Sequence, residues 1–184
     1  MATYVFWLLL VGCIGTALLL GLLKMERWRK SSINKASYRP KSRIYDAIER
    51  LFLGHLVWAV GRHVIIMGKV RLADVITLGP DLKGKMRKEA YDRIARQHID
   101  FVLCDKKTTQ ILCAVELYDP TANPKQTLMQ ARFIDDVFKQ AGIPIARFPR
   151  AKKYLSHEIE SAVRKTLAAA GVSWAQDRKA RAAS

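Results

Sequence analysis

Two carboxylates on neighbouring predicted strands have the residue type and spacing that favour chemistry in this sequence. Residues 98–105 (HIDFVLCD) and 111–118 (ILCAVELY) are apolar runs around a short polar break, a pattern typical of a β-hairpin. A loop centred on Thr108 pairs Asp100 with Glu116, and directly opposed residues share one face of a sheet. Because their Cβ atoms are then about 5 Å apart, the two charges repel unless a cation or a proton lies between them.

An oxygen-only pair of this kind suits a hard cation such as Mg²⁺. The alternative is that one carboxylate lies at a strand end and is solvated there, and spacing alone leaves both interpretations open. Other chemistries find less support. The three cysteines and four histidines show no zinc-binding spacing, and the chain has no phosphate-binding glycine loop, GxSxG or HExxH motif.

The remaining elements must position this hairpin. Apolar residues recur at helical spacing from Arg43 to about Val60, which predicts an amphipathic helix with Glu49 pointing towards the sheet. The chain order α-β-β-(α)-β-β-α-β-α indicates an α/β fold, a mixed central sheet flanked by helices on both faces. The other predicted elements are strands at 63–67 and 69–78 (or one bent strand interrupted at Gly68), a short helix at 87–96, a helix at 124–141, a strand at 143–148 and a helix at 155–170.

The N-terminal residues 4–23 contain no charged side chain, and a helix of twenty residues spans about 30 Å, the thickness of a bilayer core. We therefore expect a transmembrane anchor over residues 1–23, with a signal peptide as the competing interpretation. A basic juxtamembrane linker over 24–42 follows. By the positive-inside rule the protein is then single-pass in a bacterial inner membrane, with its N-terminus outside and its C-terminal domain in the cytoplasm. The linker is expected to lie against anionic lipids.

Charge is the strongest feature of the composition. Lys and Arg number 32 against 16 acidic residues, a formal net charge of +16. Basic blocks prefer polyanions, either anionic lipid heads or nucleic acid phosphates, and composition does not choose between them. The predicted organisation is completed by a domain over 43–170 and a basic flexible tail over 171–184.

Four segments resemble an uncharacterised bacterial domain family of the restriction-endonuclease-like, PD-(D/E)xK, nuclease superfamily. They are KVRLADVI (69–76), HIDFVLCD (98–105), AVEL (114–117) and AGIPIARF (141–148), within a resemblance that spans about 43–150. The resemblance implies a restriction-endonuclease-like core. It further implies that Glu49, Asp100 and Glu116 hold Mg²⁺ for phosphodiester hydrolysis of DNA.

The chain departs from the superfamily pattern at Tyr118, which stands where the third element normally supplies a Lys. A neutral Tyr replaces neither a Lys nor a metal-binding carboxylate, so Lys125 or Gln130 of the following helix are candidates for that role. His98 precedes Asp100 by two residues and lies opposite Tyr118 in the predicted register. It is expected to be a proton shuttle, a DNA contact or a hydrogen-bonding partner of Tyr118.

Three functions follow from these features. The first is a membrane-tethered, Mg²⁺-dependent nuclease. Its phosphate contacts would come from Lys125 and from Arg147, Arg150, Lys152 and Lys153 around the last strand. The second is a catalytically degenerate pseudonuclease that binds nucleic acid as an accessory or scaffold. The third is a membrane-associated interaction protein whose basic segments contact lipids only.

Overall fold

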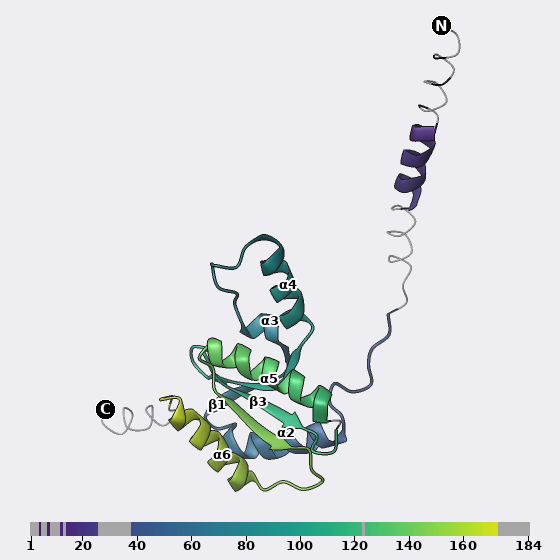
Figure 1. Ribbon diagram of the computed structural model, residues 1–184. Helices are drawn as coiled ribbons and strands as arrows, with labels where there is room; N and C mark the ends of the chain where they lie inside the picture. The colour runs from purple at the N-terminus through teal and green to yellow at the C-terminus, as the bar shows by residue number, and fades with distance from the viewer. Residues whose placement is uncertain are drawn as a thin grey trace. The chain divides into compact units, whose positions relative to one another are not determined.

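The computed structural model describes residues 4, 7, 12, 14–25, 38–122 and 124–172, without the side chains of 124–127. The chain divides into two compact units, Met1–Ser42 and Arg43–Ser184, which are described separately. The second unit carries the sheet and all the labelled helices (Figure 1).

Four strands form one sheet in the order β1-β2-β3-β4. The strands are β1 (Val64–Arg71), β2 (His98–Asp105), β3 (Ile111–Tyr118) and β4 (Ile145–Pro149). The first three are antiparallel neighbours, whereas β4 runs parallel to β3 through the crossover helix α5 (Pro124–Gln140). This arrangement confirms the predicted mixed sheet. It also places the ends of β1, β3 and β4 beside the start of β2 at one end of the sheet.

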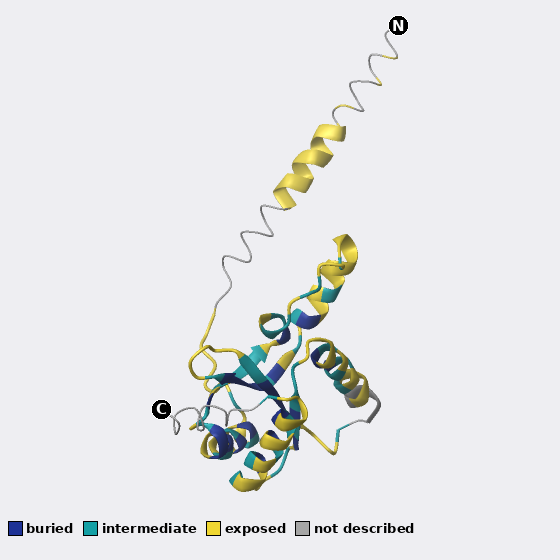
Figure 2. Cartoon of the chain, turned by 90° about the vertical axis from the view of Figure 1, so that its left-hand side faces the viewer, coloured by how far each residue is buried: buried dark blue, intermediate teal, exposed yellow. Residues whose placement is uncertain are grey.

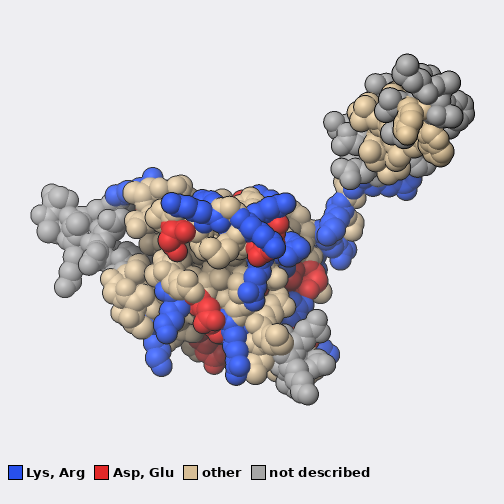
Figure 3. Space-filling model, turned by 45° about the horizontal axis from the view of Figure 1, so that its top comes forward, with Lys and Arg blue, Asp and Glu red and all other residues tan. Residues whose placement is uncertain are grey.

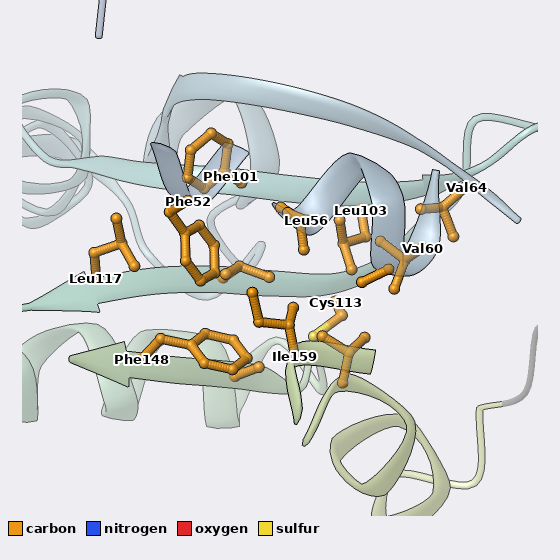
Figure 4. Close-up of a cluster of buried hydrophobic side chains, with 14 of the residues drawn as sticks. Phe52, Leu56, Val60, Val64, Phe101, Leu103, Cys113, Leu117, Phe148 and Ile159 are labelled. Atoms are coloured by element: carbon orange, nitrogen blue, oxygen red, sulfur yellow. The ribbon is translucent and has the colours of Figure 1, made fainter. Parts of the chain in front are cut away.

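Helices cover both faces, because the strands bury apolar side chains on both. On one face α2 (Ala47–Val60) and α6 (Ser156–Ala169) pack on a cluster that includes Phe101 and Leu103 of β2. On the other face α5 packs on a second cluster that includes Val102 and Cys104. Figure 4 shows the first cluster, with Phe52 and Leu56 of α2 against the sheet. The alternation along β2 therefore separates two cores, as expected for a covered central sheet.

The predicted hairpin register holds over its central pairs. Phe101 pairs with Val115, Val102 with Ala114 and Leu103 with Cys113, all symmetric about position 108. The register shifts between Leu103 and Cys104, where a bulge lies close to the loop.

The predicted strand over 69–78 ends early. Strand β1 stops at Arg71, and the chain turns into α3 (Leu72–Val75) and then α4 (Gly84–Ala95). Arg71 and Asp74 form a two-bond ion pair across this turn, and Leu72 is fully buried beneath it. Short apolar runs are ambiguous between strand and helix by periodicity alone, and burial of Leu72 decides for the turn here. We call residues 72–97 the α3–α4 arm; in Figures 1 and 2 α4 projects away from the sheet.

The predicted transmembrane anchor is wrong. Among the residues that the structure describes, no helix is long and apolar enough to cross a membrane. Residues 1–3, 5, 6, 8–11 and 13 of the expected anchor, and most of the linker and tail, lie outside the described residues. The single-pass inner-membrane location depended on that helix and is corrected with it.

Replacing Phe52 by Ala should test the core beneath α2. Phe52 is fully buried, and its ring lies 5.8 Å from that of Phe101, 5.1 Å from that of Phe148 and 5.0 Å from that of Tyr154. We expect the variant to lose about 3–5 kcal/mol of unfolding free energy, measured by chemical denaturation of the full chain. The matched control is Trp58→Ala on the same helix. Since Trp58 is 78% exposed, its loss should stay within about 0.5 kcal/mol. Equal losses in the two variants would contradict this description of the core.

Candidate functional site

The N-terminal cap of helix α2 positions the side chain of Glu49 at the edge of the sheet. Asp46 is the N-cap residue; its carboxylate accepts the backbone N–H of Glu49 at 2.9 Å. In return, Oε2 of Glu49 accepts the backbone N–H of Asp46 at 3.0 Å. This reciprocal capping box fixes the Glu49 side chain and satisfies two N–H groups of the first turn. Glu49 is the buried charged residue of the described chain.

Lys69 of β1 joins Glu49 to Asp100. Its ammonium nitrogen lies 2.6 Å from Oε1 of Glu49 and 2.9 Å from Oδ1 of Asp100. Burial disfavours the charge of Lys69, but the hydrogen bonds from its ammonium to the two carboxylates outweigh burial and raise its pKa above the usual value. The helix and two strands therefore meet at one protonated side chain.

The backbone is distorted where Lys69 and Asp100 face each other. Lys69 has a φ of 55°, in the left-handed region that non-glycine residues rarely adopt. The β1–β2 register pairs Gly68 with Phe101 and Val70 with Ile99, and it skips the pair between them. Ile99 then joins the α5-side cluster, although strict alternation from Phe101 would place it on the α2 side. Backbone strain of this kind persists only where its surroundings enforce it, and here the two carboxylates hold the lysine.

Asp100 also ties the strands together. Its second oxygen, Oδ2, accepts the backbone N–H of Leu117 on β3 at 2.9 Å. Each of the four carboxylate oxygens of Glu49 and Asp100 therefore already accepts a hydrogen bond from the protein.

Glu116 belongs to a second ion-pair cluster, on the α5 side. It pairs across the sheet with Arg147 of β4, whose Nε donates to Oε2 of Glu116 at 2.8 Å. The same guanidinium donates through Nη1 to Asp135 of α5. The buried Nη2 atom of Arg147 makes no hydrogen bond, although it also lies 2.8 Å from Oε2 of Glu116. Burial raises the pKa of Glu116 against the opposing charge and hydrogen bond of Arg147, and the nearby charge of Asp100 adds to the rise.

The predicted Mg²⁺ ligands do not fit a divalent cation in this arrangement. The structure brings Glu49 and Asp100 together, but around Lys69, and it ties Glu116 to Arg147. Within the described ranges, no group of three or more His, Cys, Asp or Glu side chains is arranged to hold a metal ion. The reason is chemical: protein donors already occupy both oxygens of Glu49, both oxygens of Asp100 and one oxygen of Glu116.

The other predicted site residues lie around this end of the sheet. His98 is exposed at the start of β2 and pairs with Arg71 of β1, and the β2–β3 pairs that the structure defines begin at Phe101. Tyr118 is 41% exposed and borders a cavity of about 500 Å³ that Glu116 and Arg147 also line.

The predicted phosphate contacts divide into two groups. Arg147 forms ion pairs with Glu116 and Asp135. Arg150 pairs with Asp46, and its guanidinium also lies 3.6 Å from the carboxylate of Glu49. Lys152 and Lys153 are exposed just beyond β4. The side chain of Lys125 lies outside the described residues. Gln130, the other candidate for the Lys role, donates to Gln97 at 3.1 Å.

Sequence reasoning missed Lys69, because it sought a lysine at position 118 and in the helix that follows. The sequence held one signal for Lys69. It is a charged residue between apolar runs, and it follows Gly68, the one glycine of the predicted strand region 63–78. The capping role of Glu49 was also readable, since Asp46 precedes it by three residues in a capping-box pattern.

Replacing Lys69 by Met should destabilise the fold in a pH-dependent way. The variant leaves two carboxylates beside each other without their cation, so we expect a loss of about 1–3 kcal/mol of unfolding free energy at neutral pH. In the wild type the raised pKa means that the Lys69 contribution is complete below its unfolded pKa of about 10.5 and is lost as pH rises through the folded value.

Denaturation curves of the full chain across pH measure this difference. Lys85→Met is the matched control, because Lys85 also pairs with a carboxylate, Glu89 at 3.7 Å, but is 89% exposed. Its effect should stay within about 0.5 kcal/mol. A Lys69 variant as stable as that control at every pH would refute the central role of the ammonium.

Comparison with known proteins identifies a family. A family model described as a protein of unknown function (DUF2726) matches residues 41–167, which is more than half of the chain and extends from α2 into α6. No curated protein and no solved structure gave a match. The chain belongs to the DUF2726 family.

Proposed function

We propose that this chain is a duplex-DNA-binding protein whose nuclease-like site does not cut phosphodiester bonds. The observation that carries the proposal is the Lys69 ammonium held between Glu49 and Asp100 at 2.6 and 2.9 Å. The predicted nuclease chemistry assigned those two carboxylates to a metal ion, and an internal cation bridges them instead.

An ammonium group cannot replace a divalent metal in hydrolysis. A catalytic metal lowers the pKa of a bound water and polarises the phosphate, which requires open coordination positions. The Lys69 ammonium carries three N–H donors and directs two of them to carboxylates. The Lys69 side chain is 31% exposed, and we propose that its third N–H donates to a ligand oxygen, such as that of a phosphate, without activating water.

The charge distribution supports a polyanionic ligand. The chain carries a formal charge of +16, and Lys152 and Lys153 are exposed just beyond β4, at the sheet end where Lys69 and Asp100 lie. Lysines in such positions contact phosphates without reading base sequence, and their binding weakens steeply with salt. We therefore expect affinity for DNA of any sequence.

Metal-dependent DNA cleavage is the second candidate. The observation that favours it is that Glu49, Asp100 and Glu116 come from adjacent elements at one end of the sheet, and that Arg147 bonds only Oε2 of Glu116. Cleavage requires the carboxylates of Glu49 and Asp100 to leave Lys69, whereas binding does not.

Gel-shift and nicking measurements on the full chain separate the two candidates. We expect the wild type to shift a labelled duplex at low salt, to release it as salt rises, and to leave supercoiled plasmid intact with Mg²⁺ or Mn²⁺. The Asp100→Asn variant is the control, because it removes a carboxylate that any metal-dependent mechanism would use. Nicking by the wild type that disappears in Asp100→Asn would overturn the non-cleaving proposal, and absence of any duplex shift would overturn DNA binding itself.

A further inference from the structure

The α3–α4 arm carries a basic helix that is largely exposed. Helix α4 with its flanking residues has six basic side chains, Lys83, Lys85, Arg87, Lys88, Arg93 and Arg96, against Glu89 and Asp92. Its buried residue is Ile94, and Figure 2 shows it as a largely exposed helix projecting from the body. A helix that packs through so little of its surface derives little stability from the core, so core packing does not explain its sequence.

Some of these cations have structural partners and others do not. Arg87 donates to the carbonyl of Gly79 and so braces the preceding loop, and Arg93 lies 4.0 Å above the ring of Phe133. Lys83, Lys88 and Arg96 are exposed and form no ion pair or hydrogen bond with the residues that the structure describes. Figure 3, viewed with this side of the molecule forward, shows Lys and Arg side chains gathered on the surface with separate acidic groups between them.

The arm begins and ends beside the candidate site. It leaves β1 after Arg71 and returns to β2 at His98, and the backbone N–H of Leu72 donates to the carbonyl of Gln97 at 2.9 Å to close its base. Lys69 and Asp100 are each two residues from these junctions. The base of the arm therefore lies at the sheet end that carries the Lys69 ammonium.

The chemistry of α4 fits a DNA duplex better than a lipid surface. A helix of twelve residues is about 18 Å long, and over that length a duplex presents one negative charge per about 1.7 Å of its axis to basic side chains. Its exposed apolar residues are Met86 and Tyr91, which do not form the continuous apolar face of an interfacial helix. We propose that α4 is a docking surface for the phosphate backbone of duplex DNA. This inference rests on the proposed DNA-binding function.

Paired charge removal in the full chain tests the assignment. Lys83→Gln/Lys88→Gln removes two cations from the arm, and Lys106→Gln/Lys165→Gln removes two exposed cations from the hairpin loop and α6. Fluorescence anisotropy with a labelled duplex gives the affinity and its salt dependence. In the arm variant, the slope of log Kd against log salt concentration should be smaller than that of the wild type by about two. The variant should also bind at least about tenfold more weakly at low salt. The control pair should retain the wild-type slope.

The outcomes distinguish this inference from the function on which it rests. Failure of the wild type to bind duplex overturns both. Wild-type binding with an arm variant that matches the control pair overturns only the assignment of α4. Sedimentation with phosphatidylcholine–phosphatidylserine vesicles completes the test: an arm variant that loses vesicle binding while keeping full DNA affinity would also overturn it. Thermal unfolding of both variants checks that they fold.

Discussion

The site end of this sheet depends on one cation, the ammonium of Lys69. It brings the buried Glu49 of α2 to Asp100 of β2, and Asp100 in turn holds the backbone of β3 through Leu117. The φ of 55° at Lys69 and the skipped strand pair are consistent with the lysine being drawn out of the regular pleat by its partners. Like charges this close need a counter-charge, and the chain supplies it from within.

The acidic residues of the site pair with cations of the protein itself, so the fold alone does not establish a catalytic activity. The sheet is mixed, and the acidic residues Glu49, Asp100 and Glu116 lie at one end of it. The cations Lys69, Arg147 and Arg150 nevertheless interact with those same acids or with their neighbours. In the function that we propose, a phosphate at this end meets ammonium and guanidinium groups beside the exposed Lys152 and Lys153, and the basic α4 extends this surface away from the sheet.

The periodicity of apolar residues was enough to predict the elements of the core, but not the ion pairs of the site. The hairpin register about Thr108, α2, α5 and α6 followed from apolar spacing, because each buries a regular face. The strand predicted over 69–78 is wrong beyond Arg71. There the chain turns into α3, with Leu72 buried and Arg71 paired with Asp74. Glu49, Asp100 and Glu116 do not form one group as predicted. Lys69 pairs with Glu49 and Asp100, whereas Arg147 pairs with Glu116. A positive φ at a lysine and the choice of long-range partners leave only a weak local signal, here a charged residue beside Gly68 between apolar runs.

The most direct test of the central claim is ¹⁵N NMR of the lysine ammonium groups in the full chain, with Lys69→Gln to assign the signal of Lys69. An ammonium bonded to two carboxylates should exchange its protons slowly and give a signal distinct from those of solvated lysines. The account predicts that this signal is unchanged when millimolar Mg²⁺ is added. Loss of the signal on addition of Mg²⁺, with the ammonium becoming solvent-like, would show that a metal ion displaces Lys69 and would contradict the account.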